Sequence, residues 1–213
     1  MTNSALIIVD MQNDFVENGA LPVKNGKDII SNINNLIDIS KQKRFLILAS
    51  KDYHPEMHIS FAENKDFYHN STFQKYLDKQ KEFWPAHCVV GSEGSEFCWE
   101  LNSKEIKNIF YKGTDLFFDA YSVFNNDSSL QKHHYKLDNY LKHNNISTLY
   151  VCGLTMDFCV LHTCLDAIKY GYKVFLITDA TKMYDESKLQ ETIEIYKKNG
   201  IHLITTKEFK NAK

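Results

Sequence analysis

Residues 148–178, TLYVCGLTMDFCVLHTCLDAIKYGYKVFLIT, predict a strand, a helix and a second strand in succession. The runs 148–152 and 174–178 are short and apolar, as expected for buried strands, whereas apolar residues recur at helical spacing between Asp157 and Tyr170. Parallel strands need a crossover connection, and a helix of this length supplies one. This stretch therefore indicates an α/β protein.

The same alternation continues on both sides of this stretch. Strands are expected at 6–9, 45–49, 109–111 and 202–205, and helices after Gly26, at 128–143 and at 186–198, where Gly200 ends the last one. Repeated alternation of this kind predicts a three-layer α/β/α fold, with a mainly parallel central sheet and helices on both of its faces.

Length and composition suit one compact domain. The 213 residues are 43% hydrophobic, so we expect a single domain over residues 1–213. The alternation breaks at about 51–103, an insertion rich in histidine, aromatic and polar residues, and long insertions are often functional. Lys and Arg number 25 against 27 Asp and Glu, a formal net charge of −2, so neither nucleic acid nor a membrane is expected as a partner. A small-molecule ligand is favoured.

The apolar runs and the cysteines indicate the compartment. The first apolar run, 5–9, is too short for a signal peptide or a membrane span, and no later run is long enough. The five cysteines, at 88, 98, 152, 159 and 164, form an odd set without paired spacing, which argues against a disulfide framework. We therefore expect free thiols and a cytoplasmic protein.

Polar residues follow several of the predicted strands. Asp10, Asp52, Lys112 and Gly153 each come soon after one. Ligands of open α/β sheets bind beyond the carboxyl ends of the strands, so these residues are candidates for a common site. Structural interpretations remain open, because Asp10 could cap the following turn and Lys112 could extend to the surface. If Lys112 points into the cleft, it is a fixed cation that can hold a thiol and a carboxylate in their charged forms.

Cys159 is the candidate nucleophile. It lies two residues after Asp157, the expected N-cap of a helix, where exposed N–H groups and the helix dipole stabilise a thiolate and lower the thiol pKa. The alternative is a small core residue, which is the more common role of a cysteine. Cys152 and Cys164 lie within apolar periodicity and are expected to have that role.

The insertion contains a candidate metal site. Asp52 and His54 project to the same side of an extended chain and could bind one ion together. The candidates for a third ligand are His87 and His58, and more weakly Glu63 and Ser60. A carboxylate with imidazoles suits zinc, manganese or iron better than calcium. Short histidine spacings also arise by chance, so these residues alone leave metal binding open.

Together these segments resemble the nicotinamidase branch of the isochorismatase-like hydrolases. The matching blocks run in family order over about residues 5–180, and jointly they are far more specific than any one of them. They are 7–15 (IIVDMQNDF), 51–55 (KDYHP), 58–62 (HISFA), 84–89 (WPAHCV), 91–94 (GSEG), 112–113 (KG), 121–124 (YSVF) and 153–160 (GLTMDFCV). The resemblance implies the isochorismatase-like hydrolase fold.

The resemblance also implies roles for individual residues. Its catalytic triad is Asp10, Lys112 and Cys159, and the backbone N–H groups of Thr155 and Cys159 form its oxyanion hole. A non-proline cis peptide bond is implied between Leu154 and Thr155. One departure concerns Thr155-Met156, where the family usually has Ala-Thr. The added hydroxyl and the bulk of Met156 can reshape the pocket.

For the metal and the substrate, the resemblance is equally specific. One divalent metal ion, zinc first with manganese or iron as alternatives, is expected on Asp52, His54 and His87, which leaves the role of His58 open. The metal is expected to bind the pyridine nitrogen of the substrate. The residues expected around the substrate ring are Phe15, Trp84 and Tyr121.

The implied activity is that of a nicotinamidase, which deamidates nicotinamide to nicotinic acid and ammonia through a thioester intermediate, in NAD salvage. Two alternatives remain: a related hydrolase acting on another amide or on a vinyl ether, and a non-catalytic member that binds a small ring. A homo-oligomer is compatible with the resemblance.

Overall fold

One parallel sheet organises the chain. The computed structural model describes residues 3–69, 71–127 and 136–211. Within them six strands pair in the order β3-β2-β1-β4-β5-β6, and every neighbouring pair is parallel. The strands are β1 (Ser4–Val9), β2 (Leu46–Asp52), β3 (Asn108–Lys112), β4 (Thr148–Leu154), β5 (Lys173–Lys182) and β6 (His202–Ile204). The predicted α/β class is confirmed.

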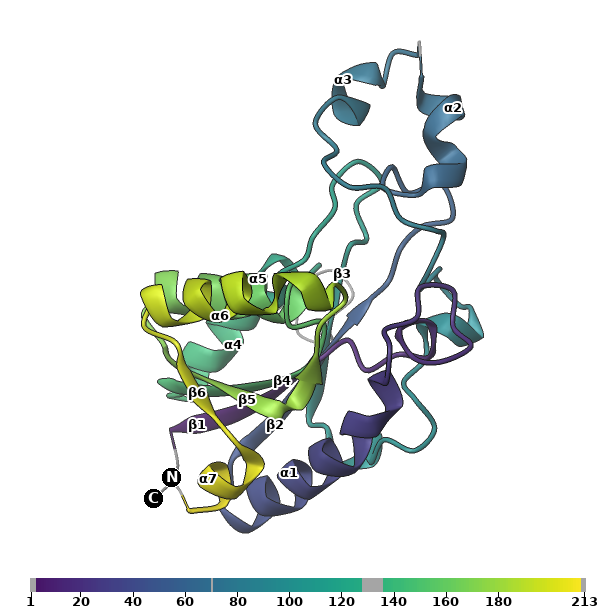
Figure 1. The fold of residues 1–213 in the computed structure, drawn as a ribbon. Helices are drawn as coiled ribbons and strands as arrows, with labels where there is room; N and C mark the ends of the chain where they lie inside the picture. Colours follow the sequence, from purple (N-terminus) through teal and green to yellow (C-terminus); the bar gives the residue numbers. More distant parts are fainter. Residues whose placement is uncertain (1–2, 70, 128–135, 212–213) are drawn as a thin grey trace.

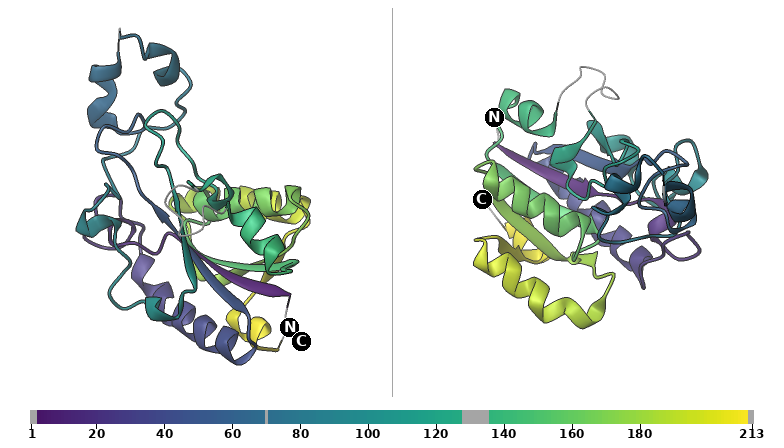
Figure 2. Two further views of the ribbon diagram at one scale, coloured as in Figure 1. Left: turned by 180° about the vertical axis from the view of Figure 1, so that it is seen from behind. Right: turned by 90° about the horizontal axis from the view of Figure 1, so that it is seen from above.

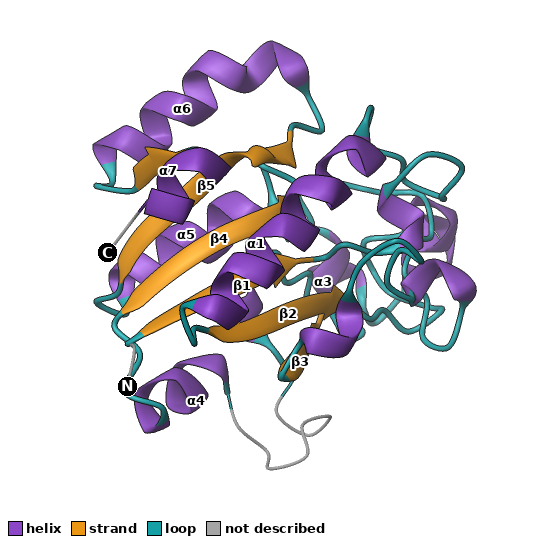
Figure 3. Cartoon of the chain, turned by 90° about the horizontal axis from the view of Figure 1, so that it is seen from below, coloured by secondary structure: helices purple, strands orange, loops and turns teal. Residues whose placement is uncertain are grey.

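Helices cover both faces of the sheet (Figures 1 and 3). The covering helices are α1 (Ile30–Gln42) and α7 (Thr206–Asn211) on one face, and α4 (Leu137–His143), α5 (Cys159–Lys169) and α6 (Leu189–Lys198) on the other. Successive residues of β1 serve the two cores in turn: Leu6 and Ile8 pack with α1, whereas Ala5 and Ile7 pack with α5. This explains why β1 is buried along its whole length.

The face of α1 that meets the sheet follows from its sequence. Ile30, Ile33 and Ile37 are all at most 4% exposed, and Leu36 is fully buried beside them. Residues three and four apart lie on one side of a helix, so this spacing gives one apolar stripe against β1 and β2. The helix predicted after Gly26 is thereby confirmed, and a 3-10 turn at Gly26–Ile29 leads into it.

The insertion projects from the sheet as a lobe (Figures 1 and 2). It carries two four-residue helices, α2 (Lys65–Tyr68) and α3 (Gln74–Leu77), over a small core of Ile59, Tyr68 and Leu77. Its two arms then run side by side, because isolated β-bridges join His54 to Val89 and Phe61 to Trp84. The insertion thus folds back on itself and returns residues 84–89 to the end of β2.

Several predicted boundaries change. Strands β2, β3 and β4 extend to Asp52, Lys112 and Leu154, beyond the predicted ends, because polar and glycine residues at these ends still pair within the sheet. Of the helix predicted at 128–143, residues 128–135 lie outside the described residues, and α4 begins at Leu137. The helix predicted from residue 186 starts with a 3-10 turn before α6, and the short α7 was not predicted.

In the described ranges, no helix combines the length and the apolar character that crossing a membrane requires. All five cysteines are buried free thiols, as their odd number predicted.

Candidate active site

Asp10, Lys112 and Cys159 meet at the carboxyl ends of the strands. Asp10 directly follows β1, Lys112 ends β3, and Cys159 begins α5 after β4. The chain leaves β1 and β4 toward opposite faces of the sheet, and such a switch point opens a crevice. The Lys112 Nζ lies 2.9 Å from Asp10 Oδ2 and 3.4 Å from Cys159 Sγ. All three side chains are buried, so they interact at short range with little screening.

Lys112 also binds a second carboxylate. Its Nζ donates to Asp52 Oδ1 at 2.5 Å, while the Ser50 hydroxyl donates to Asp10 Oδ1 at 2.7 Å. Burial disfavours the charged ammonium, but the Asp10 and Asp52 carboxylates outweigh it and hold the pKa of Lys112 well above its usual value. Lys112 is therefore a permanent cation between two acids.

The environment of the Cys159 thiol contradicts the expected lowering of its pKa. Burial, followed by the negative charges of Asp10 and Asp52, raises the pKa of Cys159 well above the usual value, although Lys112 acts in the opposite direction. Burial also raises the pKa of Asp10, against the opposing charge of Lys112. The resting thiol is therefore protonated and needs a base.

The predicted N-cap is also wrong. Phe158 occupies the cap position of α5 and makes no side-chain capping bond. The Asp157 carboxylate instead accepts hydrogen bonds from the backbone N–H groups of Tyr184, at 2.9 Å, and Asp185, at 2.8 Å. Asp157 therefore ties the segment just after β5 to the segment that carries the nucleophile.

Two backbone donors lie unused beside the nucleophile. The peptide bond between Leu154 and Thr155 is cis, as the resemblance implied. The Thr155 carbonyl accepts hydrogen bonds from the N–H groups of Phe158 and Val160. Within the described ranges, the N–H groups of Thr155 and Cys159 themselves donate to no acceptor. The resemblance implies these same two donors for an oxyanion hole.

Asp52, His54 and His87 form a group that could hold a metal ion. One potential ligand atom from each lies within 4.8 Å of the others, and all three residues are buried. The Nδ1 atoms of His54 and His87 are each 2.8 Å from a backbone carbonyl, of Gly113 and Pro85 respectively. A histidine oriented in this way presents Nε2 to a metal, so the donor set and its supports fit a zinc-type site.

The other ligand candidates have partners of their own. His58 Nδ1 lies 2.7 Å from the Ser60 hydroxyl and Nε2 lies 3.3 Å from the Phe118 carbonyl, so both ring nitrogens of His58 are engaged. The Glu63 carboxylate accepts from the Ala86 N–H at 3.2 Å. The geometry therefore favours His87 over His58 as the third potential metal ligand, a choice that the sequence alone left open.

Gly113 makes the approach of β3 to His54 possible. A Cβ atom at this position would lie 2.3 Å from a ring carbon of His54. The backbone also has a φ of +66° there, which residues with side chains rarely adopt. Gly113 therefore lets Lys112 and His54 belong to one site.

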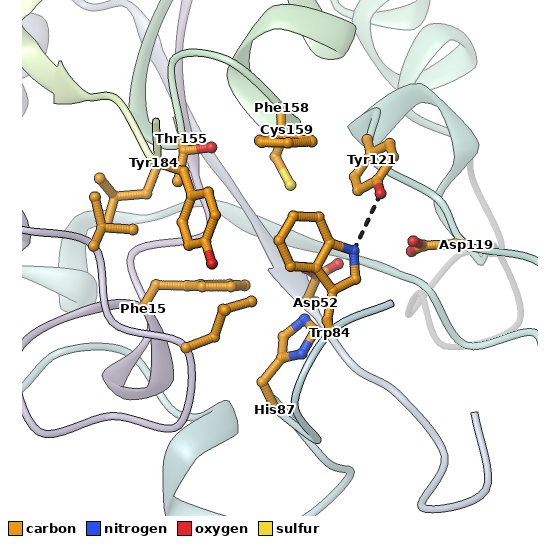
Figure 4. A pocket seen from close by; sticks show the side chains of 13 residues that line it. Phe15, Asp52, Trp84, His87, Asp119, Tyr121, Thr155, Phe158, Cys159 and Tyr184 are labelled. Carbon is orange, nitrogen blue, oxygen red and sulfur yellow. Dashed lines mark hydrogen bonds between the residues drawn. The ribbon is translucent and has the colours of Figure 1, made fainter. Parts of the chain in front are cut away.

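A ring-lined pocket opens onto Cys159 and onto Asp52 and His87 of the metal-site group (Figure 4). Phe15, Trp84 and Tyr121, the three residues expected around a substrate ring, all line it together with Cys159. The Trp84 indole N–H donates to the Tyr121 hydroxyl at 3.2 Å, which orients both rings. A flat aromatic ligand suits walls of this kind.

Other residues of the pocket were missed in the sequence. They are Leu21, Val23, Asp119, Leu154, Phe158 and Tyr184. Tyr184 follows β5 and stands edge-on to Trp84, with ring centroids 5.4 Å apart. The strand-end rule would have found it had the end of β5 been placed at Lys182 rather than at 178. Asp119 lies two residues before Tyr121, a same-side spacing that was a usable signal.

Known proteins match both the sequence and the fold. The family model of the isochorismatase domain matches residues 4–208. A nicotinamidase of Escherichia coli (strain K12) is 40% identical over 183 residues, which are 85% of this chain and 84% of that protein. The structure of an Acinetobacter baumanii nicotinamidase pyrazinamidase has a TM-score of 0.82 at 35% identity, covering 97% of this chain and 98% of that one. A zinc complex of the Pyrococcus horikoshii pyrazinamidase has a TM-score of 0.79 at 36% identity, covering 96% and 99%.

Proposed function

The chain belongs to the isochorismatase family, and from this we propose that it is a nicotinamidase that hydrolyses nicotinamide to nicotinic acid and ammonia. The observation that carries the proposal is that Lys112 contacts both Asp10 and Cys159, and that Cys159 lines a pocket of aromatic rings. A buried thiol, a buried carboxylate and a fixed cation are the parts that nucleophilic acyl transfer requires.

The first step activates the thiol. The Asp10 carboxylate takes the proton of Cys159; burial raises the pKa of both groups, which makes the carboxylate a stronger base for this transfer. Lys112 stays charged and stabilises whichever partner carries the negative charge. The thiolate then attacks the carboxamide carbon, and the electron pair of the C=O bond moves to oxygen.

Backbone donors stabilise the tetrahedral intermediate. The free N–H groups of Thr155 and Cys159 hydrogen-bond to the oxyanion, and one such donor contributes on the order of 3 kcal/mol in other hydrolases. When the C–N bond breaks, Asp10 gives its proton to the nitrogen and ammonia leaves. Water, deprotonated by Asp10, then attacks the thioester, and the C–S bond breaks to release nicotinic acid and the thiol.

Asp52, His54 and His87 would hold a divalent metal ion, for which zinc is the first candidate. The carboxylate and imidazole donors support zinc, as does the zinc bound by the similar Pyrococcus horikoshii pyrazinamidase. Such an ion supplies a Lewis acid for the pyridine nitrogen of the substrate. Phe15 and Trp84 enclose the ring and so place its carboxamide before Cys159, which lowers the entropic part of the barrier.

The experiment compares nicotinamide with benzamide, which lacks the ring nitrogen, by measuring ammonia release from the zinc-loaded protein. We expect release from nicotinamide and a much lower kcat/KM for benzamide. Equal turnover of the two amides would overturn the role given to the metal-site residues. An absence of release from nicotinamide would overturn the activity itself.

The described residues act as one domain whose insertion supplies the metal-site histidines. The product serves NAD salvage, and the five free thiols support a reducing compartment such as the cytoplasm.

A further inference from the structure

The Thr155 hydroxyl is a buried polar atom without a partner. Thr155 is 7% exposed, and its Oγ1 makes no hydrogen bond to any described residue. Buried hydroxyls are nearly always hydrogen-bonded, because leaving one unpaired destabilises the folded protein. An orphaned hydroxyl in a pocket therefore points to a ligand that pairs with it.

The position of Thr155 identifies the part of the ligand it faces. Thr155 lines the pocket together with Cys159, and in Figure 4 its hydroxyl points toward the Cys159 side chain. The Thr155 carbonyl is already engaged, whereas its N–H is not. The residue therefore offers two donors, one N–H and one O–H, at the place where the nucleophile attacks.

Among the described residues, two other buried hydroxyls are unpaired, but unlike Thr155 they lie away from the pocket. Ser40 lies in α1 and Thr181 in β5, and neither lines the pocket. Thr181 is 5% exposed, almost the same as Thr155. It is a matched control for the effects of an unpaired buried threonine that has no access to the ligand.

We propose that the Thr155 hydroxyl donates a hydrogen bond to the substrate carbonyl oxygen as that oxygen becomes negative, as a third donor beside the two N–H groups. A hydrogen bond to an anion is stronger than one to a neutral carbonyl, so the bond acts mainly in the transition state. The inference rests on the proposed amide hydrolysis. It gives the threonine, which stands where the resemblance expected alanine, a direct part in the reaction.

The first measurement is the kinetics of nicotinamide hydrolysis by three variants. Thr155→Val keeps the shape and removes the hydroxyl, so kcat should fall about 10- to 100-fold, while KM stays within about twofold. Thr155→Ser keeps the hydroxyl and should retain most of the activity. Thr181→Val should match the unmodified protein. The melting temperature of Thr155→Val should not decrease, because the substitution removes an unpaired buried group.

The second measurement tests whether the Thr155 hydroxyl pairs with the carbonyl oxygen of the substrate or with its amide nitrogen. Pyridine-3-carbaldehyde has no amino group, and Cys159 can add to it: the S–C bond forms, the C=O electron pair moves to oxygen, and the thiol proton passes to Asp10. The dissociation constant of this adduct, measured by calorimetry, should increase at least about tenfold in Thr155→Val. It should change little in Thr155→Ser and in Thr181→Val.

Each outcome of these measurements supports or overturns the role proposed for the Thr155 hydroxyl. If Thr155→Val binds the aldehyde as tightly as the unmodified protein does, the inference is wrong, whatever happens to the amide. A loss confined to amide hydrolysis would assign the hydroxyl to the leaving nitrogen instead and would also overturn it. If the unmodified protein releases no ammonia from nicotinamide, the proposed function fails, and the aldehyde comparison still decides the role of the hydroxyl.

Discussion

Lys112 links the nucleophile to the candidate metal site. Its ammonium contacts Asp10 and Cys159 on one side and Asp52 on the other. Asp52 is thus shared, because it belongs to the metal-site group and also neutralises the cation beside the thiol. His87 belongs to that group too but has no contact of this kind with Lys112. Substitution can therefore distinguish the role of Asp52 from the role of His87.

Asp52→Asn and His87→Ala should both weaken zinc binding at least about tenfold, because each removes a ligand. Only Asp52→Asn should change the reactivity of the Cys159 thiol. The Asp52 charge contributes to raising the pKa of Cys159, whereas burial lowers the pKa of His87 to about 4 and leaves its ring neutral near pH 7. Metal-free Asp52→Asn should therefore react faster with iodoacetamide than metal-free His87→Ala. Equal alkylation rates would show that Asp52 has no influence on the nucleophile.

The pH dependence should report Asp10. Burial raises its pKa above the ordinary 3.8, against the opposing charge of Lys112, and only the carboxylate can accept the thiol proton. Activity is therefore absent below this pKa and appears as the pH rises through it. With zinc in excess, the acid limb of kcat/KM should have its midpoint above 3.8. Asp10→Asn should be inactive at every pH, and measurable activity of that variant would exclude Asp10 as the base.

At the scale of elements, Gln12 joins three segments behind the site. Its fully buried side chain donates to the carbonyls of Asp52, at 2.8 Å, and Ser95, at 2.9 Å, and accepts from the Asp52 N–H at 2.8 Å. The segment after β1, the end of β2 and the turn around Ser95 are thereby held together. The position of the Asp52 carboxylate depends on these bonds.

Gln12→Ala leaves three buried backbone groups unpaired and should lower the free energy of unfolding by about 2 to 4 kcal/mol. It should also weaken zinc binding, because the end of β2 is released. Asn13→Ala is the matched control, since it removes one exposed side-chain bond to the Glu93 carbonyl and should cost less than about 0.5 kcal/mol. Urea unfolding and zinc titration test both effects, and equal stability of the two variants would contradict this role of Gln12.

The sequence pattern could predict where helices and strands lie but not where each of them ends. Continuous apolar runs located β1 and β4, which are buried along almost their whole length, and the helical spacing of apolar residues located α5. The pattern ended β5 four residues early, since exposed and half-buried residues toward the end of that strand break the apolar run. It also assigned Asp157 to α5, whereas tertiary bonds to residues 184 and 185 take its carboxylate.

At the scale of the whole molecule, long-range contacts are what the pattern could not predict. The insertion brings His87 beside His54 through the pairing of its two arms, and nothing in local spacing distinguishes that outcome from His58 as the ligand. Strand-end residues were expected to meet, but the fully buried contact of Lys112 with both acids depends on the sheet order. The absence of a partner for the Thr155 hydroxyl likewise depends on the tertiary packing around the pocket.

In the whole molecule, the carboxyl ends of the strands bring Cys159, its base Asp10 and the Lys112 cation together beside a pocket that can bind a ring. The most direct test is ammonia release from nicotinamide by the zinc-loaded protein and by Cys159→Ala, which removes only the sulfur. The unmodified protein should release ammonia, and Cys159→Ala should lose at least about a thousandfold in kcat. Unchanged release by Cys159→Ala would contradict the account.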